Sequence, residues 1–147
     1  MRSIVVFLFL IGMVFGCAQP KKTEDYKTVR DEVMQFHDEV MKDQETVVEN
    51  QMKLDTLLKD LKGLKTQFPS IDTVQEAAAL RTVIQRLVKA DDNMNNWMHQ
   101  FEPDVTGKSN EEAVAYFQSE KKKVASIDSV YKQEINSTSN YLKKFGK

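Results

Sequence analysis

Residues 26–68 read YKTVRDEVMQFHDEVMKDQETVVENQMKLDTLLKDLKGLKTQF, and this stretch decides the fold. An apolar residue recurs every seven positions, and a second apolar set stands three positions after the first; the two sets are Tyr26, Val33, Val40, Val47, Leu54, Leu61 and Phe68, with Val29, Phe36, Leu57 and Leu64. This spacing is typical of a helix with a coiled-coil-like seam. It predicts one helix over about residues 24–66, which ends before Pro69 because the residue preceding a proline disfavours helical geometry.

Two further amphipathic helices are expected after that proline. Thr73 and Glu76 have the spacing of a capping box, which satisfies free amides at a helix start. The apolar stripe of this second helix is Leu80, Val83, Ile84, Leu87, Ala90, Met94, Trp97, Met98 and Phe101, and Pro103 follows it. Ser109 and Glu112 form another capping box, and the third helix carries Ala113, Phe117, Val124, Ile127, Tyr131, Tyr141 and Phe145 on one side.

The connections between these helices are short, so successive helices are expected to be antiparallel neighbours. The sequence therefore predicts an all-α fold, an antiparallel up-down-up three-helix bundle with coiled-coil-like seams, in one helical bundle domain over residues 24–147. The sustained seam leaves a second option open, in which the first helix also pairs with another copy of the chain.

Residues 1–16 have the features of a secretory signal peptide. A positive charge is followed by an apolar run that is shorter than the roughly 20 residues of a transmembrane helix. The run ends in Val14-Phe15-Gly16-Cys17, which resembles the lipobox of bacterial lipoproteins: an aliphatic residue, a small residue, Gly or Ala, then Cys. Phe15 is bulkier than the residue that this pattern has at its second position.

The lipobox resemblance implies that the signal peptide is cleaved before Cys17 and that Cys17 becomes an acylated N-terminus. Residues 17–23 then form the lipidated start and a short tether. Because each buried methylene contributes about 0.8 kcal/mol, two or three acyl chains hold a protein firmly on a bilayer. Ala18 stands where lipoproteins of the inner membrane often have Asp. We therefore expect a lipid-anchored protein of the bacterial cell envelope, on the outer membrane and facing the periplasm.

Two helical motifs carry a second resemblance. Residues 34–41 read MQFHDEVM, and residues 94–101 read MNNWMHQF. Together with the lipobox, they are similar to a group of small helical bacterial lipoproteins, some of which carry the loose label "viral A-type inclusion protein". The likeness covers most of the mature chain and implies a helical lipoprotein. The group carries no assigned activity that this chain could inherit.

Composition and motifs exclude several function classes. The 21 basic and 22 acidic side chains leave no broad positive charge for nucleic acid, and one cysteine excludes an internal disulfide or a Cys-based zinc site. The sequence has no Ser/His/Asp set, Gly-rich phosphate loop or dinucleotide fingerprint. We expect a protein that is not an enzyme, has no catalytic residue and no cofactor, and serves a structural or interaction role with an envelope protein or a second copy.

One group of residues suits a metal ion and gives an alternative function. Met34, His37 and Met41 fall within about 60° of one helix face. If the first two helices pair antiparallel around Pro69, residues at the same level have numbers that sum to about 139. Met41 then lies level with Met98, and His37 and His99 fall at the same end of the bundle. Thioether and imidazole ligands suit Cu(I) or Ag(I). The alternative is a periplasmic soft-metal protein with these five ligands, although methionines at such spacing also fit core packing.

Polar residues interrupt the apolar seams. Asp43 and Asn50 occupy seam positions in the first helix, Asp91 interrupts the second stripe, and Glu120 lies on the inner side of the third helix. We expect Asp91 and Glu120 to lie at the same level. Di-metal bundles use Glu-x-x-His pairs, which this chain lacks, so the sequence favours a polar layer that sets helix register.

Overall fold

The structure is a computed structural model, and it describes residues 24–147. The signal peptide expected over residues 1–16 and the lipidated tether expected over residues 17–23, with Cys17, lie outside the described residues.

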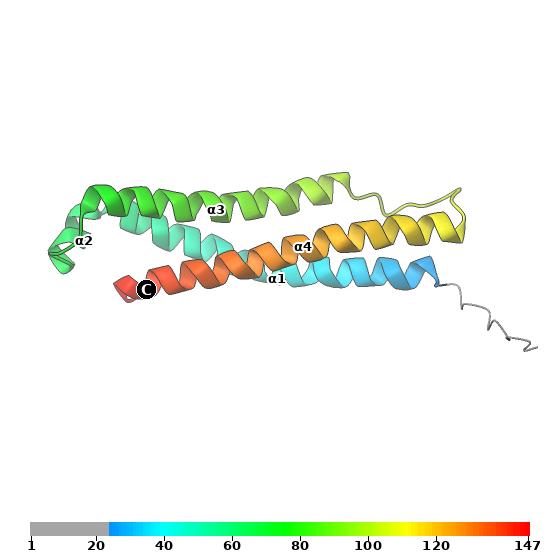
Figure 1. Cartoon of the computed structure of the whole chain (residues 1–147), viewed down its shortest axis with the longest axis horizontal. Helices are drawn as coiled ribbons and strands as arrows, with labels where there is room; N and C mark the ends of the chain where they lie inside the picture. Colours follow the sequence, from blue (N-terminus) through cyan, green and yellow to red (C-terminus); the bar gives the residue numbers. More distant parts are fainter. Residues whose placement is uncertain (1–23) are drawn as a thin grey trace, which may run out of the picture.

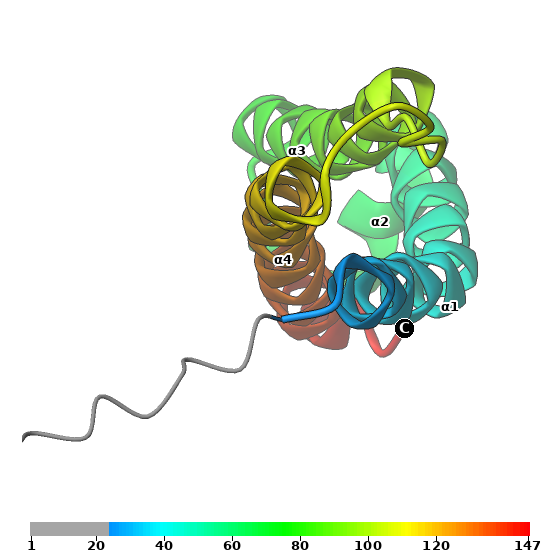
Figure 2. The same ribbon diagram turned by 90° about the vertical axis from the view of Figure 1, so that its right-hand side faces the viewer.

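The described chain is all helical, as predicted. Its elements are α1 (Tyr26–Lys59), α2 (Leu61–Gln67), α3 (Thr73–Gln100), α4 (Asn110–Leu142) and a final 3₁₀ turn η1 (Lys143–Phe145), and no strand occurs among residues 24–147. The three long helices lie side by side, with α1 and α4 running in one direction and α3 in the other (Figure 1). Figure 2 looks along them and shows the three helices surrounding a common axis.

The helix expected over residues 24–66 is two helices, so the prediction of one continuous helix was wrong. The break lies at Asp60, whose φ of −116° and ψ of 53° leave the helical region. Its carboxylate accepts a hydrogen bond of 2.9 Å from the backbone amide of Gly63, which caps the start of α2. A Cβ at Gly63 would collide with this carboxylate, so any other residue at position 63 would require the Asp60 side chain to shift.

Helix caps set the other starts. The capping box of Ser109 and Glu112 is present as predicted. The cap of α3, however, is Asp72 and not Thr73, because the Asp72 carboxylate accepts hydrogen bonds of 2.9 and 3.1 Å from the amides of Val74 and Gln75. Aspartate is the stronger capping residue, which moves the cap one residue before the predicted position.

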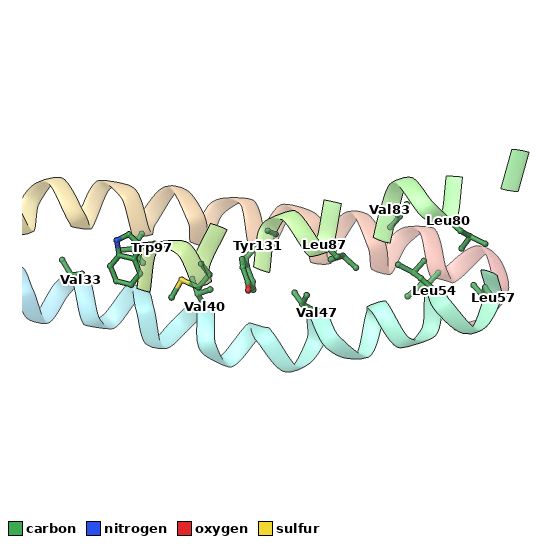
Figure 3. Close-up of a cluster of buried hydrophobic side chains, with 14 of the residues drawn as sticks. Val33, Val40, Val47, Leu54, Leu57, Leu80, Val83, Leu87, Trp97 and Tyr131 are labelled. Atoms are coloured by element: carbon green, nitrogen blue, oxygen red, sulfur yellow. The ribbon is translucent and has the colours of Figure 1, made fainter. Parts of the chain in front are cut away.

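The apolar seams form the core, as the sequence predicts. Side chains of all three long helices meet in it (Figure 3). The seam residues with no exposed surface include Val33, Val40, Val47, Leu54, Leu80, Leu87, Phe117, Val124 and Tyr131. In the part of the chain that the structure describes, no helix is both long and apolar enough to cross a membrane.

The core gives a direct stability prediction. Leu87 has no exposed surface, whereas Val88, its neighbour on α3, is 42% exposed. Leu87→Ala should lower the free energy of unfolding by about 2–5 kcal/mol, since it removes buried methyl groups and leaves a cavity. Val88→Ala is the matched control and should change it by less than about 1 kcal/mol. Urea unfolding followed by circular dichroism measures both, and equal effects would contradict the burial of Leu87 in the core.

Candidate functional site

Aromatic side chains gather where α3 ends. The ring of Trp97 stacks on Phe101 with centroids 4.9 Å apart, and Phe101 lies 6.5 Å from Tyr116 and 6.2 Å from Phe117. Tyr26, in the first turn of α1, stacks on Phe117 at 6.3 Å. These contacts tie the end of α3 to the first turns of α1 and α4, so Trp97 sits in a fixed environment.

A buried carboxylate holds the indole of Trp97. The Nε1–H group of Trp97 donates a hydrogen bond of 2.9 Å to Glu120, whose other oxygen accepts one of 2.7 Å from Lys123. Glu120 is only 5% exposed, so it needs both partners to offset the loss of water. The hydrogen bond and the charge of Glu120 raise the pKa of Lys123. Glu120, Trp97 and Lys123 therefore form one connected polar unit.

A second polar unit, centred on the partly buried Asp91, joins all three long helices. Asp91 accepts hydrogen bonds of 2.7 Å from the Tyr131 hydroxyl and 3.4 Å from the Gln44 amide on one oxygen, and one of 3.3 Å from Asn95 on the other. Burial, together with the hydrogen bond to Asp91, raises the pKa of the Tyr131 phenol. Asp91 thus takes part in a polar layer between the helices, as expected, but its partners are Gln44, Asn95 and Tyr131 and not the other predicted members Asp43, Asn50 and Glu120.

Asp91 and Glu120 do not lie at the same level, so that prediction was wrong. Each carboxylate binds a different aromatic donor, Tyr131 for Asp91 and Trp97 for Glu120. Trp97, the partner of Glu120, stands six residues after Asp91 on α3, about 9 Å along the helix, so the two carboxylates lie at different levels. The sequence predicted that both residues face inward, but hydrogen-bond partners depend on how α4 is placed along α3.

The register of α1 on α3 also differs from the expected one. The residue numbers of His37 and Trp97, whose rings lie 6.2 Å apart, sum to 134, and those of the bonded pair Gln44 and Asp91 sum to 135. The expected sum was about 139, one helical turn away. The observed sums centre the chain reversal near residue 67, at the end of α2, and not at Pro69.

The proposed soft-metal ligands lie in different environments. His37 is beside Trp97, with its Nδ1 atom 2.9 Å from the Asp38 carboxylate. Met41 and Met98 are half-buried and pack against the core. Met34 is 36% exposed, and His99 is exposed.

No three His, Cys, Asp or Glu side chains of residues 24–147 gather closely enough to hold a metal ion. A site that uses methionine sulfur stays a prediction from the sequence.

A Cu(I) titration of the full chain tests that prediction through Trp97, the only tryptophan. A Cu(I) ion held by His37 and Met41 would lie close to the indole and should quench its fluorescence. Met41→Leu conserves volume but removes the sulfur, so it should weaken binding. Met52→Leu, at a methionine that is 65% exposed and outside the predicted set, is the control. Absence of quenching would leave these methionines as packing residues.

A shallow, open groove lies beside Trp97 on the outside of the α3–α4 pair. Its volume is about 500 Å³. The lining residues are Asn93, Asn96, Trp97 and Gln100 from α3, with Lys122, Lys123, Ser126 and Ile127 from α4. The exposed lining is mostly apolar, and carboxamides, a hydroxyl and two ammonium groups surround it. We call this feature the α3–α4 groove.

Sequence reasoning missed this groove, although part of its signal was visible. Asn93, Asn96 and Gln100 are spaced i, i+3 and i+7, which puts three carboxamides on one face of α3. The α4 wall could not be assigned, because that requires the register between the helices. The sequence predicts Lys121-Lys122-Lys123 to be a solvated charge run, and these side chains are indeed at least partly exposed. Lys121 pairs with Glu32 at 2.7 Å and Lys123 with Glu120.

Comparison of the chain with protein-family models, with curated proteins and with solved structures found no match.

The Tyr131–Asp91 hydrogen bond predicts a pH-dependent stability. Tyr131→Phe should cost about 1.5–3 kcal/mol at pH 7, the usual range for a hydrogen bond to a charged group. Because the folded chain raises the phenol pKa above its ordinary value of about 10, this stabilisation is present below pH 10 and is lost as the pH rises further.

Urea unfolding at several pH values between 8 and 11 measures the effect. Tyr131→Phe should lose less stability over this range than the parent chain does. Tyr141→Phe gives a comparison, since burial and the hydrogen bond to Glu76 raise the pKa of Tyr141 in the same direction. An unchanged alkaline loss in both variants would contradict the assignment.

Proposed function

We propose that this chain is a lipid-anchored protein of the bacterial envelope whose helical domain binds other proteins and carries no enzymatic activity. The observation that carries the proposal is the chemistry of the α3–α4 groove. Its walls present carboxamides and ammonium groups, which form hydrogen bonds and ion pairs with a bound chain. Its floor is apolar, as in many binding sites.

The anchoring part of the proposal is supported by the lipobox-like sequence that ends at Cys17. Seven residue steps separate Cys17 from Glu24, and such a segment reaches at most about 25 Å. An acylated Cys17 would therefore keep the start of α1 close to a bilayer. The bilayer is the first partner in this proposal, and the outer membrane, facing the periplasm, is its location.

The groove would lie in the half of the molecule nearer to that bilayer. Trp97 is beside His37, which stands 11 residues after the start of α1. At about 1.5 Å per residue, the groove is some 17 Å along the helix from the point where the tether would enter. A partner that reaches it would itself be near the membrane.

We also propose that α1, α3 and α4 act as an antiparallel up-down-up three-helix bundle, with α2 as an additional turn at one end. Polar contacts between each pair of long helices support this arrangement. They include Gln44 with Asp91 for α1 and α3, Arg86 with Glu134 for α3 and α4, and Lys132 with Glu39 for α1 and α4.

Membrane fractionation and photo-crosslinking in cells test the function. The native chain should be found in the membrane fraction with an acylated N-terminus at Cys17 by mass spectrometry, and Cys17→Ser should release it. A photo-crosslinking residue in place of Asn96, which lines the groove, should give a discrete adduct with a protein in the native chain.

The same residue in place of Asn136 is the control, since Asn136 is exposed on α4 and does not line the groove. It should give no adduct of that mass. A soluble product cut at another position would refute the anchoring, and identical adduct patterns from both positions would refute a binding role for the groove.

A further inference from the structure

The α3 wall of the groove is a ladder of carboxamides. Asn93, Asn96 and Gln100 are all exposed, and each carries both hydrogen-bond donors and an acceptor. A peptide backbone offers the same two kinds of group in alternation. The ladder rises about 10 Å from Asn93 to Gln100, the length of about three residues of extended chain. The wall therefore matches the backbone of a short extended segment.

The α4 wall adds positive charge. Lys123 shares its ammonium group with the buried Glu120, whereas Lys122 is exposed and makes no ion pair within residues 24–147. No carboxylate side chain is part of the groove lining. An occupant with carboxylate groups is thus attracted, and one with ammonium groups is repelled.

The floor of the groove disfavours sugars and bases. Both classes bind by stacking on an open aromatic face. Trp97 is only 6% exposed, and Phe101 stacks on one of its faces. Together with the half-buried Ile127, Trp97 instead provides a small apolar surface on which one aliphatic side chain can pack.

We infer that the α3–α4 groove binds a short, extended and acidic peptide segment of a partner protein. This inference rests on the proposed interaction role and names the chemistry of the partner. The carboxamide ladder binds the main chain, Lys122 and Lys123 bind carboxylates, and the floor accepts one aliphatic side chain. Because successive side chains of an extended segment point to opposite sides, a Glu-Leu-Glu segment can direct leucine to the floor and both carboxylates to the rim.

Trp97 reports on such binding. A carboxylate that pairs with Lys123 competes with Glu120, and Glu120 is the acceptor of the Trp97 Nε1–H group. Occupation of the groove should therefore change the fluorescence of the only tryptophan.

The test titrates the full chain, kept in solution with a mild detergent, with the peptide acetyl-Gly-Ser-Glu-Leu-Glu-Ser-Gly-amide. Its counterpart with Gln-Leu-Gln at the centre has the same shape without the charges. The acidic peptide should change Trp97 fluorescence and bind about tenfold more tightly than its counterpart, since two exposed ion pairs are lost. Higher salt should reduce this difference, because it screens exposed charges.

Substitutions in each wall of the groove test how that wall contributes to peptide binding. Lys122→Gln should weaken binding of the acidic peptide about fivefold, and Asn96→Ala should weaken both peptides alike. Lys62→Gln changes an exposed lysine on α2, far from the groove in sequence, and is the matched control with no expected effect. All three side chains are exposed, so the helical circular dichroism should stay unchanged.

Equal affinity for the two peptides, or an unchanged affinity in Lys122→Gln, would overturn the inference. Equally tight binding of an acidic oligosaccharide such as polygalacturonate would also overturn it, because the groove would then be a general anion surface. A protein adduct from position 96 together with equal peptide affinities would leave the proposed function standing and remove only this inference. If position 96 gives no protein adduct and the two peptides bind equally, both the proposed function and this inference are refuted.

Discussion

The carboxylates of Glu120 and Asp91 constrain the register of the three helices, because each accepts hydrogen bonds from a neighbouring helix. Apolar seams with a seven-residue repeat pack almost equally well after a shift of one repeat, whereas an interior carboxylate needs particular donors at its own level. Glu120 binds the indole of Trp97, and the partly buried Asp91 binds the hydroxyl of Tyr131. An unsatisfied buried acceptor costs about 1–3 kcal/mol, enough to disfavour a shifted packing.

The groove is a consequence of this register. Because Glu120 holds Trp97 inside the bundle, the carboxamides that flank Trp97 on α3 stand opposite the lysines that follow Glu120 on α4. A shift of α4 by one turn would put other side chains opposite the ladder. The same hydrogen bonds that stabilise the fold thus determine the composition of the candidate binding surface.

Features that depend on periodicity and local chemistry were predictable from the sequence. The apolar seams and the capping box at Ser109 were found in this way. The break at Asp60 was not predictable in this way. The apolar pattern continues past Asp60 without interruption, and it does not indicate that the Asp60 carboxylate caps a new helix there. The partners of Asp91 and the α4 wall were also missed, since they depend on placement between helices that are separate in sequence.

An acylated anchor would suit a groove of this kind. About three residues of a partner fit along the ladder, so the contact area is small and the intrinsic affinity is expected to be modest. A short tether from Cys17 would confine the groove to a thin layer above the bilayer, together with other membrane-bound proteins. Such confinement raises the effective concentration of a partner, to the millimolar range for short flexible links, and a weak contact is then largely occupied. Anchoring and shallow recognition would therefore work together, with the lipid supplying proximity and the groove supplying selectivity for acidic segments.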